Sequence, residues 1–121
     1  MNWLKISALN LALAVALGAF GAHGLKKMAD VYAQQIWQTA TLYLFIHALG
    51  LLALGVLQKL GHHVAKVALC LQIGVVIFSG TLYLMALGLP RWLGAITPIG
   101  GTLMIIGWLL LAFSTLKKDN V

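Results

Sequence analysis

The chain has 121 residues, of which 62% are hydrophobic and only 8% are charged. A soluble domain carries roughly 25% charged residues, so this composition excludes a soluble globular protein and indicates that the lipid bilayer is the main partner of the chain. The net charge of +6 comes from positive residues scattered between apolar stretches, without the basic stripe that nucleic-acid binding requires, so no nucleic-acid partner is expected.

Four long stretches of the chain contain no Asp, Glu, Lys or Arg. They cover residues 6–25, 31–58, 67–90 and 92–116. About 18 consecutive apolar residues are enough to cross the hydrocarbon core as a helix. The sequence therefore predicts an all-α fold, in which residues 1–121 form a single polytopic transmembrane domain: an antiparallel bundle of four transmembrane helices with short turns.

The first helix is expected at about residues 3–22. Ala14, Gly18 and Ala22 recur every four residues and so share one face, where small side chains allow a second helix to approach closely. Lys5, the apolar stretch and the small residues near 19–22 also resemble a secretory signal. The apolar run is about 20 residues long, however, whereas a signal core usually has 7–15, so we expect the helix to be retained.

The second membrane crossing is expected at about residues 37–58, with the chain entering the helix near Val31, and the third at about 64–88. Pro90 ends the third helix, and the segment 92–96 is too short to cross, so it is expected to form an interfacial turn. The fourth helix is expected at about 97–116, with Thr97 as its cap and Pro98 at its first position, where the missing N–H costs nothing.

Glycines in the fourth helix have two possible explanations. Gly100, Gly101 and Gly107 could suggest a nucleotide-binding loop, but such a loop follows a β-strand and this segment is an apolar helix. Gly100 and Gly107 are therefore predicted to be helix-packing positions.

The distribution of positive charge predicts the orientation. Four crossings place both termini and the second turn on one side of the membrane. That side holds five positive residues: Lys5, Lys59, Lys66, Lys117 and Lys118. The other side holds three: Lys26, Lys27 and Arg91. The positive-inside rule then favours a bacterial inner (plasma) membrane protein with both termini in the cytoplasm.

The few polar side chains within the crossings are expected to gather in the non-cytoplasmic half of the membrane. His47 follows Trp37 by ten residues, which places it about 15 Å from that interface. The other members of this expected polar cluster are His23, Thr39, Tyr43, Ser79, Tyr83, Thr97 and Thr102.

Two interpretations of this polar cluster remain open. In the first, its side chains bond to one another across helices, with a neutral His47 bonded to Tyr83 or Ser79, and fix the helix register. In the second, they line a pocket for a small polar ligand, water or a proton, because an ionisable residue at such depth is often functional.

Cofactor and catalytic chemistry are not indicated by the sequence. Haem ligation by His23 and His47 would need similar depths, but these differ by roughly 10–15 Å on the helical rise. No carboxylate lies within the crossings to complete a metal site or to orient a Ser79–His47 pair. No cofactor, metal or catalytic residue is therefore expected.

Several strings resemble a known family. They include Gly18-Ala19-Phe20-Gly21-Ala22-His23-Gly24-Leu25 and Leu93-Gly94-Ala95-Ile96-Thr97-Pro98-Ile99-Gly100-Gly101, with Tyr43, His47 and Tyr83 between them. Together they resemble the small inner-membrane proteins of the YgdD and YwdK type, over nearly the whole chain. The resemblance implies four transmembrane helices and supplies no activity, because the function of that family is unknown. It also implies that His23, Tyr43, His47, Tyr83, Thr97 and Pro98 are the positions of its polar and helix-breaking residues.

The sequence thus favours a small non-enzymatic membrane protein with a structural or accessory role, able to self-associate through its small-residue faces. The alternative is a minimal transporter or channel in which the His47 cluster carries protons or a small solute.

Overall fold

The computed structural model describes residues 1–25, 27 and 30–114, and all its regular elements there are helical. In chain order these elements are α1 (Trp3–Phe20), the π-helix η1 (Gly21–Leu25), α3 (Val31–Lys59), α4 (Ala65–Ala86), the 3₁₀-helix η2 (Arg91–Ala95) and α5 (Thr97–Phe113). Four segments are long and apolar enough to cross a membrane: Trp3–Leu25, Val31–Lys59, Ala65–Ala86 and Arg91–Phe113. The predicted all-α fold with four transmembrane helices is confirmed.

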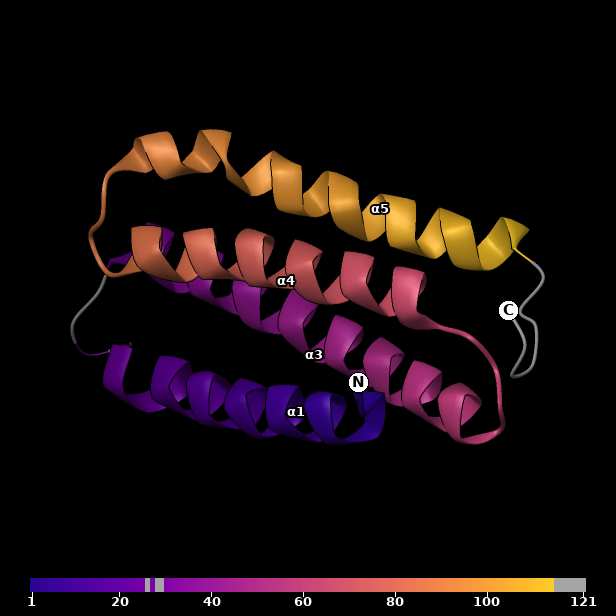
Figure 1. Cartoon of the computed structure of the whole chain (residues 1–121). Coiled ribbons are helices and arrows are strands. Elements are labelled where there is room, and N and C mark those ends of the chain that lie inside the picture. The colour runs from indigo at the N-terminus through magenta and orange to yellow at the C-terminus, as the bar shows by residue number, and fades with distance from the viewer. Residues whose placement is uncertain (26, 28–29, 115–121) are drawn as a thin grey trace.

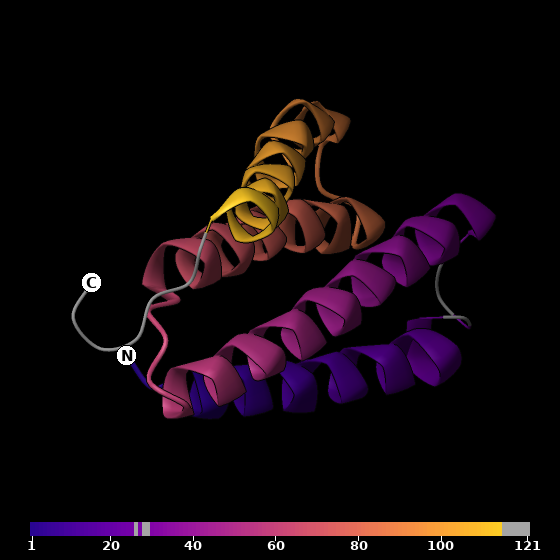
Figure 2. The ribbon, with the colours of Figure 1, turned by 90° about the vertical axis from the view of Figure 1, so that its right-hand side faces the viewer.

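The helices pack in the order in which they occur in the chain. α1 contacts α3, α3 contacts α4, and α4 contacts α5, each pair running antiparallel (Figure 1). Seen from the side, α3 and α4 lie between α1 and α5 (Figure 2). The outer helices therefore direct most of their apolar side chains outwards, among them Leu9, Leu13, Ile105 and Phe113. Such a surface suits lipid, which replaces water as the solvent of the bundle.

The second helix begins at Val31, where the chain was expected to enter it, and runs for 29 residues to Lys59. Asp30 causes the early start, because its carboxylate accepts a hydrogen bond from the Ala33 backbone N–H at 2.8 Å and caps the helix. His47 consequently lies just past the middle of α3, rather than in its first half.

The other predicted boundaries also shift. The third helix covers Ala65–Ala86 instead of 64–88, and the predicted turn at 92–96 is the 3₁₀-helix Arg91–Ala95. Thr97 is the first residue of α5, which Ile96 precedes as the cap, so the predicted Thr97 cap is wrong. The predicted end at residue 116, like Lys26, Lys117 and Lys118, lies outside the described residues.

Glycine ends both central helices in the same way. Gly61 and Gly88 adopt φ values of 94° and 99°, which glycine reaches without a steric penalty. The next residue then donates back into the last turn: His62 N–H to the Leu57 carbonyl at 3.0 Å, and Leu89 N–H to the Leu84 carbonyl at 3.1 Å. These are Schellman caps, and they turn the chain within a few residues at opposite membrane surfaces.

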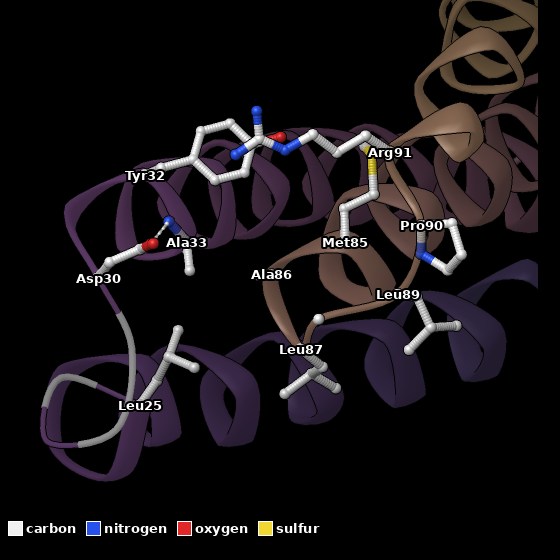
Figure 3. Close-up of a pocket in the computed structure, with 11 residues that line it drawn as sticks. Leu25, Asp30, Tyr32, Ala33, Met85, Ala86, Leu87, Leu89, Pro90 and Arg91 are labelled. Atoms are coloured by element: carbon white, nitrogen blue, oxygen red, sulfur yellow. Dashed lines mark hydrogen bonds between the residues drawn. The ribbon is translucent and has the colours of Figure 1, made fainter.

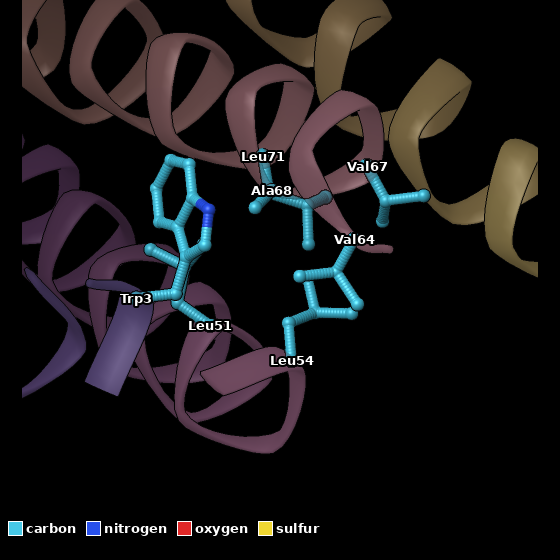
Figure 4. Packing of buried hydrophobic residues seen from close by; sticks show 7 residues of the cluster. All are labelled: Trp3, Leu51, Leu54, Val64, Val67, Ala68 and Leu71. Carbon is cyan, nitrogen blue, oxygen red and sulfur yellow. The ribbon is translucent and has the colours of Figure 1, made fainter. Parts of the chain in front are cut away.

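The core runs the length of the bundle as three clusters of buried side chains. Near the N-terminus, the Trp3 indole lies against α3 and α4, beside Leu51, Leu71 and their neighbours (Figure 4). In the middle, each of the four long helices contributes one residue: Ala14, Leu44, Val75 and Met104. At the far end, Leu25, Ala33, Trp37 and Ala86 close the core.

A close helix crossing joins α4 and α5 at two glycines. A Cβ atom added to Gly100 would lie 2.5 Å from both the Gly74 carbonyl oxygen and the Phe78 backbone nitrogen. A Cβ atom added to Gly74 would lie 2.8 Å from the Gly100 carbonyl oxygen. The two backbones are therefore in direct contact, as small residues permit in lipid, where packing rather than water exclusion holds helices together.

We expect Gly100→Ala to separate α4 from α5, because the new methyl group would overlap backbone atoms that cannot rotate away. The expected loss is about 1–3 kcal/mol, typical of overpacking, read as a lower unfolding midpoint in detergent. Gly80→Ala is the matched control, since its Cβ would meet no atom within 4 Å. Equal midpoints for the two variants would contradict the close crossing.

Candidate functional site

Histidine 47 lies inside the membrane with both ring nitrogens bonded. Its side chain is 5% exposed, and its Nε2 accepts a hydrogen bond from the Trp108 indole N–H of α5 at 3.0 Å. Its Nδ1 lies 2.8 Å from the Tyr43 carbonyl oxygen, one turn earlier in α3. An indole nitrogen can only donate, so Nε2 is the acceptor and the ring proton sits on Nδ1, which donates to the carbonyl. The imidazole is thus neutral, and both of its nitrogens are hydrogen-bonded within the protein.

Space for this pair comes from a glycine. Trp108 reaches across to α3 at Gly50, where an added Cβ would lie 2.8 Å from the edge of the indole ring. The Trp108 ring is also 5.7 Å from the His47 ring, centroid to centroid. The result is one polar and aromatic contact between α3 and α5, near the middle of the bilayer.

Trp37 forms the corresponding contact between α3 and α1. Its indole N–H donates to the Leu17 carbonyl at 2.8 Å. Gly21, the first residue of η1, faces the same ring, and an added Cβ there would lie 2.5 Å from it. The π-helix η1 therefore begins at the residue that faces the Trp37 ring. Side chains inserted into a helical hydrogen-bond ladder are a recognised cause of such irregularity.

Two further bonds join α3 to α4. The Ser79 hydroxyl donates to the Ala40 carbonyl at 2.8 Å, and the hydroxyls of Thr41 and Tyr83 lie 2.8 Å apart. The Tyr83 ring also packs edge-on against Trp37, with centroids 4.4 Å apart. His47 therefore bonds to neither Ser79 nor Tyr83, contrary to the partners expected from the sequence, because each of these already has a partner one to two turns away.

Two more helix pairs, α4–α5 and α1–α4, are joined in the same manner. The hydroxyls of Thr81 in α4 and Thr97 in α5 lie 2.6 Å apart. In the other half of the bundle, the Asn10 amide of α1 donates to the Gln72 side-chain oxygen of α4 at 2.8 Å. Five pairs of helices are thus linked by at least one hydrogen bond that uses a side chain.

The prediction of a single polar cluster is therefore wrong, because the polar side chains form separate contacts between helices. Tyr43, His47, Ser79, Tyr83 and Thr97 lie at or beside these separate helix contacts. The other predicted members do not take part in them. Thr39 and Thr102 bond to carbonyls of their own helices and are exposed, and His23 is exposed at η1. A threonine hydroxyl within a membrane helix can donate its hydrogen bond to the carbonyl four residues earlier in the same helix. The spacing of residues in the sequence does not show whether it does so or bonds to another helix.

Thr41, Thr81 and Trp108 form contacts between helices that were not predicted from the sequence. A signal for each was present. Thr41 and Thr81 begin the two identical strings Thr-Leu-Tyr-Leu at 41–44 and 81–84. Trp108 lies deep in an apolar helix, whereas tryptophan in membrane proteins is enriched at the interfaces, and a buried indole N–H usually finds a partner.

The predicted small-residue positions are mostly used within the chain. Ala14 is fully buried, and a Cβ on Gly18 would lie 3.5 Å from the Thr41 methyl group, so this face packs α1 on α3. Ala22 is exposed. Gly100 contacts α4 as described, and a Cβ on Gly107 would lie 2.8 Å from Leu71. Ala14, Gly18, Gly100 and Gly107 thus pack helices of the same chain against each other.

Comparison with known proteins places the chain among uncharacterised membrane proteins. The family described as "Protein of unknown function (DUF423)" matches residues 17–101. A UPF0382 membrane protein of Staphylococcus epidermidis is 51% identical over 117 residues, which cover 95% of each chain. One of Staphylococcus saprophyticus is 47% identical over 116 residues, covering 95% of this chain and 97% of its own.

The UPF0382 membrane protein YwdK of Bacillus subtilis is 40% identical over 119 residues, covering 95% of this chain and 96% of its own. The resemblance seen in the sequence is therefore confirmed. No solved structure gives a significant match.

We expect Trp37→Phe to weaken the contact between α1 and α3, because the phenyl ring fills most of the space but cannot donate to the Leu17 carbonyl. The loss should be about 1 kcal/mol in unfolding free energy, as for other hydrogen bonds between membrane helices. Trp92→Phe is the control, since Trp92 is 65% exposed. An unfolding midpoint in detergent that shifts equally for both variants would contradict the assigned bond.

Proposed function

The chain belongs to the DUF423 family of proteins of unknown function, and we propose that it is a non-enzymatic integral membrane protein with a structural or accessory role. One observation carries this proposal. The polar side chains deep in the bundle are bonded in pairs between helices, and the His47 imidazole has both nitrogens occupied. Both partners are groups of the protein itself, a backbone carbonyl and an indole N–H, whereas a catalytic base is hydrogen-bonded to the group whose proton it takes.

This arrangement favours a framework role over the transport alternative. In a bilayer an unpaired polar group costs several kcal/mol, so bonds of this kind hold the helices in one register. The contacts join five different pairs of helices, and together they extend from Asn10 and Gln72 in one half to Thr81 and Thr97 in the other. We therefore assign these polar groups the role of holding the four helices together.

We further propose that the chain resides in the bacterial inner membrane with both termini in the cytoplasm. The relatives are named membrane proteins, and the four apolar helices supply the crossings. The start of α1, the turn between α3 and α4 and the end of α5 lie at one end of the bundle (Figure 1). Lys5, Lys59 and Lys66 belong to that end, and positive residues favour the cytoplasmic surface.

His47→Ala provides the test of function. We expect liposomes containing the wild-type chain to conduct no more protons than empty liposomes, measured with an entrapped pH-sensitive dye, and the variant to behave identically. The same change should lower stability in detergent by about 1 kcal/mol. Thr39→Ala is the control on the same helix, because Thr39 bonds only to its own helix. Wild-type flux that disappears in a folded His47→Ala variant would establish the transport alternative.

A double-mutant cycle isolates the His47–Trp108 contact. His47→Ala and Trp108→Phe each remove one partner, so together they should cost less than the sum of the single losses. The expected coupling is about 0.6–1.7 kcal/mol, the range found between membrane helices. Additive losses in unfolding free energy would show that the two side chains do not stabilise each other.

Orientation is tested by cysteine labelling in bacteria that express the full chain. Cys70, the one native cysteine, is first replaced by alanine. An impermeant maleimide added to intact cells should then label Leu89→Cys but not Lys59→Cys, since these positions lie at opposite ends of the bundle. Permeabilised cells should show labelling of both variants. The reverse pattern in intact cells would place the termini outside.

A further inference from the structure

A hollow of about 570 Å³ opens at the end of the bundle that carries the first and third turns. It is lined by Leu25, by Asp30, Tyr32 and Ala33, and by residues 85–91 (Figure 3). The four apolar segments end or begin there, at Leu25, Val31, Ala86 and Arg91. The hollow therefore lies at the level where the hydrocarbon core of a bilayer gives way to lipid headgroups.

The positive wall of the hollow is Arg91. Its guanidinium carbon lies 4.2 Å from the centre of the Tyr32 ring, so the planar group rests on the face of the aromatic ring (Figure 3). A cation in this position is attracted by the ring and loses side-chain freedom. The guanidinium edge keeps its N–H donors, and their fork matches two oxygens of a phosphate.

The negative wall is Asp30. One carboxylate oxygen accepts from the Ala33 backbone N–H, which fixes the side chain at the edge of the hollow. Asp30 and Arg91, both of which the structure describes, form no ion pair with each other, so neither charge neutralises the other. Since Arg91 and Asp30 line the same hollow, a ligand that carries both a negative and a positive charge would complement it.

Apolar side chains complete the hollow. Leu25, Ala33 and Ala86 are buried behind it, while Leu87 and Leu89 are 53% and 42% exposed on the turn that borders it. A ligand held here would have its charged part near Asp30 and Arg91 and an apolar part beside the leucines. Phospholipids with a primary ammonium have this construction, and they are already concentrated at this depth.

We propose that this hollow binds the headgroup of a zwitterionic phospholipid, with Arg91 on its phosphate and Asp30 on its primary ammonium. The proposal goes beyond a framework role, because it gives the chain a preferred lipid. The exposed leucines favour a membrane lipid over a soluble phosphoethanolamine, which carries the same charges but no acyl chains.

Native mass spectrometry of the full chain in detergent tests the proposal. The probes are phosphatidylethanolamine, phosphatidylcholine and phosphatidylglycerol with identical acyl chains. We expect phosphatidylethanolamine to bind about tenfold more tightly than the other two, since only its headgroup offers Asp30 a charged hydrogen-bond donor. The ammonium of phosphatidylcholine has no N–H, and the hydroxyls of phosphatidylglycerol are neutral. Equal affinities for the three lipids, or a preference for phosphatidylglycerol, would overturn it.

Charge variants assign the two walls. Asp30→Asn keeps the helix cap, because asparagine caps as well as aspartate, and should reduce phosphatidylethanolamine affinity to that of phosphatidylcholine. Arg91→Gln should weaken all three lipids by about tenfold. Arg91→Lys keeps the charge but loses the planar stacking on Tyr32. Its affinity for the lipids should lie between the affinities of the wild type and Arg91→Gln. Unchanged phosphatidylethanolamine affinity in either Asp30→Asn or Arg91→Gln would overturn the assignment.

Two controls complete the experiment. Lys66→Gln removes one positive charge at the opposite end of the bundle and should leave all three affinities unchanged; a loss as large as that of Arg91→Gln would show a general charge effect and overturn the site. Glycerophosphoethanolamine, which has the same headgroup without acyl chains, should fail to displace bound phosphatidylethanolamine at equal concentration. Displacement would overturn the choice of a lipid as the ligand.

Discussion

The constraint on which this structure depends is that polar groups within a bilayer must find their partners inside the protein. Water is absent there, and each unpaired group costs several kcal/mol. In this bundle, hydroxyl, indole, amide and imidazole groups meet in pairs between different helices. The bonds fix which helices meet and at which residues, while van der Waals packing of small side chains supplies the close approach.

Glycine and tryptophan act together in this arrangement. Gly21 leaves room for Trp37 to reach the Leu17 carbonyl, and Gly50 leaves room for Trp108 to reach His47. In both cases the missing Cβ lets a large ring cross from one helix to the backbone or side chain of another. The pattern gives a physical reason for Gly21 in the string at 18–25, where the small-residue spacing had accounted only for Gly18 and Ala22.

The two ends of the bundle differ in what they offer to the surroundings. At the end that carries the N-terminus, the Gln58 side chain is bonded to the backbone of Met1 and Trp3. At the other end, Asp30 and Arg91 face a shared hollow without bonding to each other. The framework contacts and the charged hollow are thus separate features, and a lipid preference could exist with or without any other activity.

The sequence alone determined the fold class, because a charge-free stretch of this length can be satisfied in lipid only as a helix whose backbone bonds to itself. It also located the turns between residues 58 and 64 and at Pro90, and it identified His47, Tyr83 and Ser79 as the unusual residues. The sequence could not show which of these residues are hydrogen-bonded to each other. Rotation and tilt of each helix decide whether the His47 imidazole meets Tyr83 or Trp108, and these depend on close crossings such as Gly74 with Gly100. Only the tertiary structure brings residues distant in the chain within hydrogen-bond reach, so the expected single cluster became a set of separate contacts.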